Sequence, residues 1–186
     1  MKDGSAGCRG AQGLRLRMGE LDFIVGRLEP GDAAPDLDTE ALYAEPVAVI
    51  VAPGHPLAAV RRPTWAMLAG LPWVLPPAWA ASRAKLQQLF HKHRLDPPAD
   101  LIESASHLVT LTFLQQRGSV GFVAADVARQ LQAVQLAVAL PIPVPIELPP
   151  VGILRLRAGL RTAAGNRLLA LPRAQAAHGS GRPPVD

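Results

Sequence analysis

The sequence predicts an α/β fold with mostly parallel strands. Short apolar runs alternate with amphipathic stretches along the chain, which is the pattern expected of strands followed by helices. Several runs are apolar at nearly every position, as strands covered by helices on both faces must be. The chain has 186 residues, of which 49% are hydrophobic. It is therefore long enough for one sizeable domain or for two small lobes that share a core.

Six short apolar runs are the predicted strands. They lie at residues 22–28, 47–52, 73–75, 101–102, 119–123 and 151–156. Four helices are expected, at residues 82–94, 107–116, 126–133 and 162–172. The first carries one apolar stripe, and the second is apolar nearly all round and is therefore expected to be buried. We expect Gly118 to end the second helix, Asp126 to cap the third and Pro172 to stop the fourth.

The segment from residue 136 to residue 148 has an unusual pattern. Every even position is apolar, while Pro141, Pro143 and Pro145 lie between them. Alternation with a period of two indicates an extended chain with one buried face. Because proline cannot donate to a ladder of hydrogen bonds, the segment is expected to be an edge strand or a polyproline-like crossover, and not a central strand.

Composition and charge narrow the class of protein. The formal net charge is +4, but Lys and Arg are scattered, and no helix-turn-helix pattern or basic aromatic stripe indicates direct nucleic-acid binding. Cys8 is the only cysteine, which excludes an internal disulfide and suits a reducing compartment. No stretch approaches the roughly 18 uninterrupted apolar residues of a membrane span, and the start lacks the apolar core of a secretory signal. We therefore expect a cytoplasmic protein that does not associate with membranes.

The sequence contains none of the usual catalytic or metal-binding patterns. Residues 118–121 (GSVG) lack the spacing of a serine nucleophile turn, and no glycine-rich phosphate loop follows a strand. His91 and His93 are two residues apart on a predicted helix, so their side chains point in different directions. Trp65 and Trp73 are expected to be core residues. We therefore expect no enzyme activity, no metal and no cofactor.

Five phrases of the sequence occur together, in the same order and spacing, in one known family. They are MGELDFIVGRL at residues 18–28, VAPGHPLA at 51–58, LAGLPWVLPP at 68–77, ESAS at 103–106 and SVGFV at 119–123. Any one phrase alone would be weak, but the set is specific and spans residues 14–171. On these phrases the chain resembles the effector-binding domain of LysR-type bacterial transcription regulators.

The resemblance implies a two-lobed α/β fold like that of type 2 periplasmic binding proteins, incomplete at the N-terminus because the family's first strand and helix are absent. It implies part of lobe I at residues 14–60, lobe II at 61–145 and a return to lobe I at 146–173. Residues 1–13 match nothing in the family and are expected to be disordered, as is the tail at 174–186.

The resemblance also implies partners. A small-molecule effector, such as an organic acid or an aromatic or sugar-like compound, would bind between the lobes. The whole protein would be a homo-oligomer that contacts DNA only through a helix-turn-helix domain, which this chain lacks. The solute-binding protein of a transporter shares this fold and stays an alternative.

In this family the effector lies against loops that follow strands. Carried onto this chain, the expected contacts are Gly26, Arg27, Leu28, Pro76, Pro77, Ala78, Ser104, Ala105, Ser106, Phe122 and Val123. The physical argument is best for Ser104 and Ser106, which precede a helix whose free N–H groups attract a carboxylate, although either serine could simply cap that helix. Arg27 could hold an anionic effector or could pair with a carboxylate of the protein itself.

Overall fold

The computed structural model describes residues 12–28, 32, 34–78, 80–159 and 163–179. The chain divides into two compact units, one made of Met1–Glu45 with Leu148–Asp186 and the other of Pro46–Glu147. The resemblance had placed residues 46–60 in the first lobe. They belong to the second unit because the strand at residues 47–51 pairs with strands of that unit.

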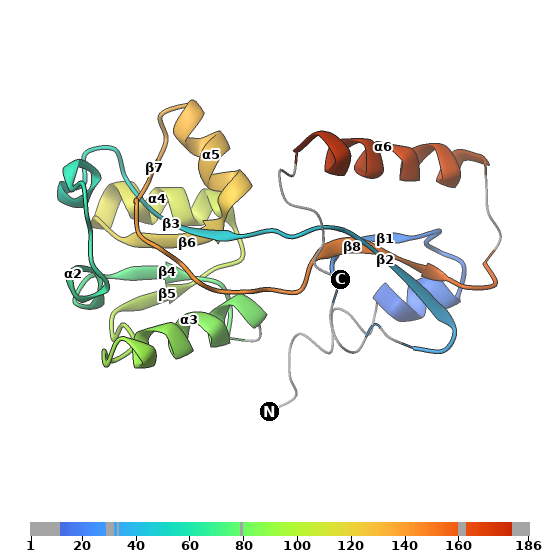
Figure 1. Cartoon of the computed structure of the whole chain (residues 1–186), viewed down its shortest axis with the longest axis horizontal. Helices are drawn as coiled ribbons and strands as arrows, with labels where there is room; N and C mark the ends of the chain where they lie inside the picture. The colour runs from blue at the N-terminus through green and yellow to red at the C-terminus, as the bar shows by residue number, and fades with distance from the viewer. Residues whose placement is uncertain (1–11, 29–31, 33, 79, 160–162, 180–186) are drawn as a thin grey trace. The chain divides into compact units, whose positions relative to one another are not determined.

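The first unit contains a three-stranded antiparallel sheet in the order β1-β8-β2 (Figure 1). The strands are β1 (Ile24–Arg27), β2 (Leu37–Tyr43) and β8 (Val151–Leu156), and the unit also holds a helical segment at residues 12–17 and α6 (Ala163–Gly179). Leu16, Leu37 and Leu154 form its buried core. β2 is not among the predicted strands, because its polar stretch of Asp, Thr and Glu hides the alternation of a strand.

The second unit is built on a five-stranded sheet in the order β5-β4-β6-β3-β7. The strands are β3 (Val47–Val51), β4 (Trp73–Leu75), β5 (Leu101–Glu103), β6 (Val120–Ala124) and β7 (Val138–Ala139). The helices are η2 (Pro56–Ala59), α2 (Trp65–Ala69), α3 (Ala81–Lys92), α4 (His107–Arg117) and α5 (Ala125–Ala133). Among the described strands, parallel pairing is found only where β4 meets β5 and β6, so the expectation of mostly parallel strands was wrong.

Both faces of this sheet are buried, as the apolar runs predicted. Val49 and Val51 of β3 pack into one core cluster, and Ile50 between them packs into another. Successive side chains of a strand point to opposite faces, so the two clusters lie on opposite sides of the sheet. Trp65 and Trp73 belong to the first cluster and are 5% and 0% exposed, which confirms that they are core residues.

Of the two expectations about helix ends in the second unit, one was confirmed and the other was wrong. Gly118 ends α4 in the left-handed conformation with φ of 59°, as predicted. Asp126 does not cap α5, because β6 runs directly into the helix and the cap position falls on Ala124. Asp126 lies instead in the first turn, where it pairs with Arg129 and its negative charge suits the positive end of the helix.

Helix α4 is less buried than its composition suggested. Thr110 and Leu114 are buried, but Leu108 is 75% exposed. Only one side of α4 packs on the sheet, against β4 and β6, so the residues on its other side stay in solvent despite being apolar.

Helix α6 in the first unit continues through Pro172, where the sequence analysis expected it to stop. Proline removes one backbone hydrogen bond from a helix, which weakens the helix there without necessarily ending it. Residues 174–179, which were assigned to a disordered tail, are therefore helical. Cys8, the start of the chain and residues 180–186 lie outside the described residues.

The proline-containing segment is an edge strand followed by an extended crossover. Its first part forms β7, which pairs with β3 at the edge of the five-stranded sheet, as predicted. The N–H of Leu140 then donates to the carbonyl of Val49 at 2.9 Å. Beyond this point the chain stays extended and buries Ile142 against the core.

Gly152 provides a test of the sheet in the first unit. It is paired with Gly26 on one side and Ala41 on the other, and a Cβ there would overlap the carbonyl oxygen of Glu40 and lie 2.7 Å from Cδ1 of Leu28. We predict that Gly152→Ala lowers the free energy of unfolding by at least about 2 kcal/mol, because backbone atoms must move. The matched control is Gly70→Ala, where the added Cβ meets nothing within 4 Å. Equal stability of the two variants in chemical denaturation would contradict the predicted packing.

A second prediction concerns pH. Arg173 on α6 donates from Nε to the carboxylate of Glu40 on β2 at 2.7 Å, and this hydrogen bond holds the pKa of Glu40 below its ordinary value of 4.5. Because that pKa is lowered by folding, the pair stabilises the protein above about pH 4.5, and the contribution disappears as the pH falls through the folded-state pKa. Glu40→Gln should therefore cost up to about 1 kcal/mol at pH 7, and the cost should shrink as the pH falls below 4.5. A loss that stays the same from pH 7 to acidic pH would show that the pair is not responsible.

Candidate functional site

Three strands of the second unit end at the same edge of its sheet. β4 runs parallel to β5, with Leu75 opposite Glu103, and also parallel to β6. The helices α3, α4 and α5 follow these three strands along the chain, so all of them begin at this edge (Figure 1). The N–H of Ser104 donates to the carbonyl of Leu75 at 3.0 Å. The predicted loops at residues 76–78 and 104–106 are therefore neighbours.

Ser106 caps α4, which was one of the two roles that the sequence left open. Its Oγ accepts a hydrogen bond from the N–H of Val109 at 3.4 Å. The Oγ of Ser104 accepts from the N–H of Ser106 at 3.0 Å and donates to the carbonyl of the same residue at 3.4 Å. Both serines thus hold the first turn of α4 in place. Within the described part of the chain, the N–H groups of His107 and Leu108 keep no protein partner.

Arg83 is the residue of this edge that the sequence analysis missed. It lies in the first turn of α3 and is only 6% exposed. Its Nη1 donates to the carbonyl of Pro76 at 3.2 Å and lies 3.4 Å from Oε1 of Glu103, so one side chain bridges the ends of β4 and β5. Its Nε is buried and has no hydrogen-bond partner among the described residues. The sequence did contain one indication that Arg83 is unusual: it is a cation in the first turn of a predicted helix, where a positive charge is unfavourable.

The charge of Arg83 is only partly balanced by the protein. Its carboxylate partner among the described residues, Glu103, has a side chain that is 45% exposed, so solvent screens that interaction. The helix that carries Arg83 has Ala80 at its N-cap and no side-chain cap, which leaves backbone N–H donors at the same place. Helix N-termini and a buried guanidinium together give this edge a positive potential, which is complementary to a carboxylate or another small anion.

The predicted contacts in the first unit lie at the end of β1. The N–H of Leu28 donates to the carbonyl of Pro150 at 2.9 Å. Nη1 of Arg27 donates to the carbonyl of Pro149 at 2.6 Å, and Nη2 forms an ion pair with Glu45. Of the two roles considered for Arg27, the structure therefore shows the pairing with a carboxylate of the protein.

The remaining predicted contacts differ in accessibility. Ala78 and Ala105 are exposed in their loops, and Pro77 accepts a hydrogen bond from the N–H of Ala80 at 2.9 Å. The resemblance placed Phe122 and Val123 in a loop, but they lie within β6, where the apolar run at residues 119–123 predicted a strand, and they are 3% and 7% exposed. They pack into opposite core clusters, so they support the edge from within the sheet.

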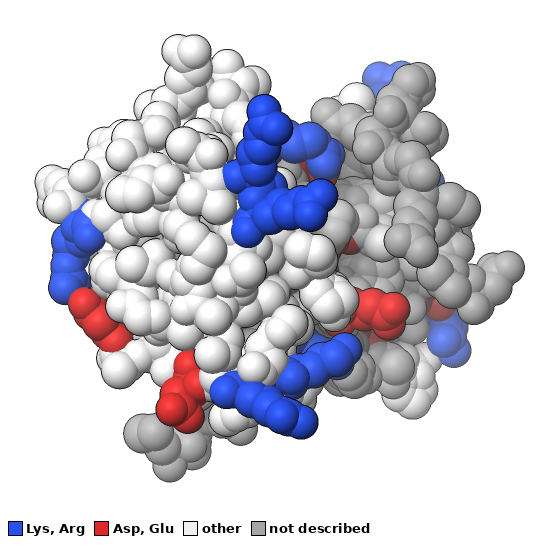
Figure 2. Space-filling model, turned by 60° about the vertical axis from the view of Figure 1, so that its left-hand side comes forward, with Lys and Arg blue, Asp and Glu red and all other residues white. Residues whose placement is uncertain are grey.

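Charged side chains are spread over the face of the molecule that Figure 2 shows. Figure 2 shows Lys and Arg in small separate groups on the face in view, with uncharged surface between them. Among the described residues, no three His, Cys, Asp or Glu side chains are grouped as a metal ion would require. No helix in the described ranges combines the length and the apolar character needed to cross a membrane.

Comparison with known proteins identifies the family. Residues 10–177 match the model of the LysR substrate binding domain. The HTH-type transcriptional regulator GbpR of Azospirillum brasilense is 30% identical over 155 residues, which cover 80% of this chain and 45% of that protein. The chain thus spans about half the length of the curated relatives it matches.

Solved structures show the same fold. The effector binding domain of QuiR in complex with shikimate has a TM-score of 0.68 at 14% identity, covering 91% of this chain and 78% of that chain. The BenM effector binding domain with its effector benzoate has a TM-score of 0.67 at 22% identity, covering 94% and 78%. The two-lobed, periplasmic-binding-protein-like α/β fold is therefore confirmed. The family match also decides against the solute-binding protein of a transporter. The chain belongs to the LysR substrate-binding domain family, the effector-binding part of transcription regulators.

Proposed function

We propose that this domain binds a small anionic effector at the edge of the second unit's sheet where α3 and α4 begin. The observation that carries the proposal is Arg83, a buried guanidinium whose Nε lacks a partner in the described structure. The effector would be an organic acid, which includes aromatic and sugar-like acids. In the whole regulator, its binding would control how a helix-turn-helix domain contacts DNA.

The energetics of Arg83 support a binding role. Removing a guanidinium from water costs several kcal/mol, and a single ion pair with an exposed carboxylate offsets only part of that cost. The first turn of α3 adds a further unfavourable contribution from the helix dipole. An anionic ligand that accepts hydrogen bonds from Arg83 and from the first turns of the two helices would balance this charge.

Two relatives of the same fold also favour an acidic effector. Shikimate and benzoate, which the solved domains of QuiR and BenM hold, are both carboxylates. Pro76, Pro77, Ala78, Ser104, Ala105 and Ser106 are the candidate contacts in the second unit, and Gly26, Arg27 and Leu28 are those in the first. We further propose that the whole regulator is a cytoplasmic homo-oligomer, without catalytic activity, metal or cofactor.

The first test is Arg83→Met in the full chain. The effector is first sought among carboxylates, including shikimate and benzoate, as compounds that raise the melting temperature. We predict that Arg83→Met weakens binding of such an acid at least about tenfold, because a charged hydrogen-bond donor is lost. Stability without ligand should stay equal or rise, because an incompletely paired buried charge is replaced by a side chain of similar length. Calorimetry and denaturation measure the two quantities.

Lys85→Met is the matched control for Arg83→Met. Lys85 lies on the same helix but is exposed, so its loss should leave affinity unchanged. If Arg83→Met destabilises the domain and affinity is retained, Arg83 has only a structural role and the proposed site is wrong.

The serines give a second, independent test. We predict that Ser104→Ala and Ser106→Ala each weaken effector binding by about 1 to 2 kcal/mol, because a hydroxyl that can still take part in hydrogen bonding is removed. Ser106→Ala should also lower stability by about 1 kcal/mol, since its side chain caps α4. Thr112→Ala on α4 is the control, because its hydroxyl bonds only to the carbonyl of Leu108. Unchanged affinity in both serine variants would remove this loop from the site.

A further inference from the structure

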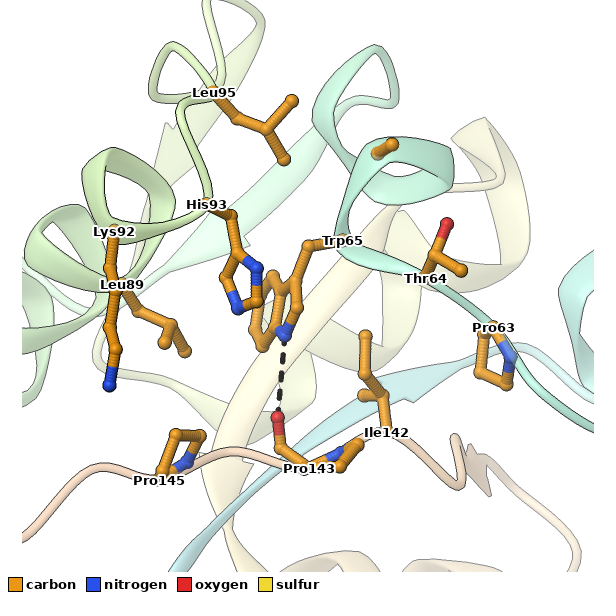
Figure 3. Close-up of a pocket in the computed structure, with 11 residues that line it drawn as sticks. Pro63, Thr64, Trp65, Leu89, Lys92, His93, Leu95, Ile142, Pro143 and Pro145 are labelled. Atoms are coloured by element: carbon orange, nitrogen blue, oxygen red, sulfur yellow. Dashed lines mark hydrogen bonds between the residues drawn. The ribbon is translucent and has the colours of Figure 1, made fainter.

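A pocket of about 520 Å³ opens in the second unit, away from the edge just described (Figure 3). It lies where α2 begins, where α3 ends and where the extended proline-containing segment passes. Its lining includes Trp65, Leu89, Lys92, His93 and Pro145. Helix α3 begins at the proposed effector site and has 12 residues, so the pocket is about 18 Å away along that helix.

The floor of the pocket is rigid and apolar. Trp65 is held by three contacts. Its Nε1 donates to the carbonyl of Pro143 at 3.3 Å. Its ring packs edge-to-face with Phe90, with ring centroids 5.5 Å apart, and stacks on His93, with ring centroids 5.8 Å apart. Leu89 beside it is only 4% exposed. A floor fixed in this way requires little ordering when a ligand binds, so little affinity is lost to entropy.

The rim of the pocket carries positive charge without a compensating acid. Lys92 and His93 are exposed at the end of α3, and Pro143 and Pro145 are exposed on the opposite side. None of the residues that line the pocket is Asp or Glu. Lys92 forms no ion pair with any residue that the structure describes. The pocket thus combines one unpaired ammonium group with an apolar interior, which Figure 3 shows as Lys92 at the side of the Trp65–His93 stack.

We propose that this pocket is a second small-molecule site, which binds an apolar monocarboxylate such as an aromatic acid. The carboxylate pairs with the ammonium group of Lys92, and the apolar body lies against Leu89, His93 and Pro145. The volume is within the range of roughly 300–1,000 Å³ typical of small-ligand sites. A wholly polar anion such as phosphate gains nothing from the apolar floor, and a neutral aromatic compound forms no ion pair with Lys92.

The indole N–H of Trp65 reports directly on this pocket. In ¹H–¹⁵N spectra of the full 186-residue chain, its signal is assigned by its loss in Trp65→Phe. Titration with benzoate should shift this signal saturably. Benzamide and inorganic phosphate should bind at least about threefold more weakly, because each lacks one of the two contributions. Lys92→Met should weaken benzoate binding by the same factor, whereas Lys85→Met on the same helix should leave it unchanged.

Arg83→Met separates this site from the proposed effector site. If the pocket binds benzoate independently, the titration of the Trp65 signal keeps its affinity in Arg83→Met. The proposal is overturned if the Trp65 signal does not shift saturably with benzoate, if benzamide binds equally well, or if Lys92→Met has no effect. It is also overturned if Arg83→Met abolishes the shift, because the signal would then report binding at the other end of α3.

Discussion

Parallel pairing of β4 with β5 and β6 is the constraint on which the candidate site depends. Parallel strands end at the same edge of a sheet, and each of these three is followed by a helix, so α3, α4 and α5 begin together. Helix N-termini carry unpaired N–H groups and a partial positive charge. The positive character of this edge is therefore a consequence of the topology, before any side chain is considered. The Ser104–Leu75 backbone hydrogen bond then holds two of the loops side by side.

Arg83 adds a full charge at the place where the backbone is already positive. Its burial and its position in the first turn of α3 both lower stability. Residues that oppose stability in this way are typical of binding sites, where the ligand supplies the missing partner. Glu103 and the carbonyl of Pro76 orient the guanidinium without neutralising it fully. The groups of this edge are thus already in place for the anion that we propose binds there.

The proline-containing segment links the fold of the second unit to the pocket at the other end of α3. Its apolar even positions bury Leu140 and Ile142 in the core. Its prolines have no N–H to donate, so the ladder between β7 and β3 does not continue along Pro143 and Pro145. These two residues remain exposed, and the carbonyl of Pro143 is free to accept from Trp65. This segment therefore buries one face in the core and lines one side of the pocket with the other.

The sequence by itself determined the family, the two-lobed α/β fold and most of the elements. β3, β4 and β6 are apolar runs, the left-handed turn at Gly118 needs a glycine, and the prolines exclude a central strand, so each follows from residues close together in the chain. The sequence also predicted the loops at residues 76–78 and 104–106 as neighbours of a ligand, but only through the resemblance. It could not show β2 or the antiparallel pairing of β3.

Only the tertiary structure revealed the groups on which the two proposals depend. Arg83 meets Glu103, which is 20 residues away, and Trp65 donates to Pro143, which is 78 residues away. In the sequence, Arg83 is one more charged residue of an amphipathic helix, and Lys92 and His93 are basic residues near a helix end. Whether such a side chain is buried, paired or left without a partner depends on distant segments that pack around it. Local patterns specify elements, whereas the electrostatics of a site are decided by which elements the fold brings together.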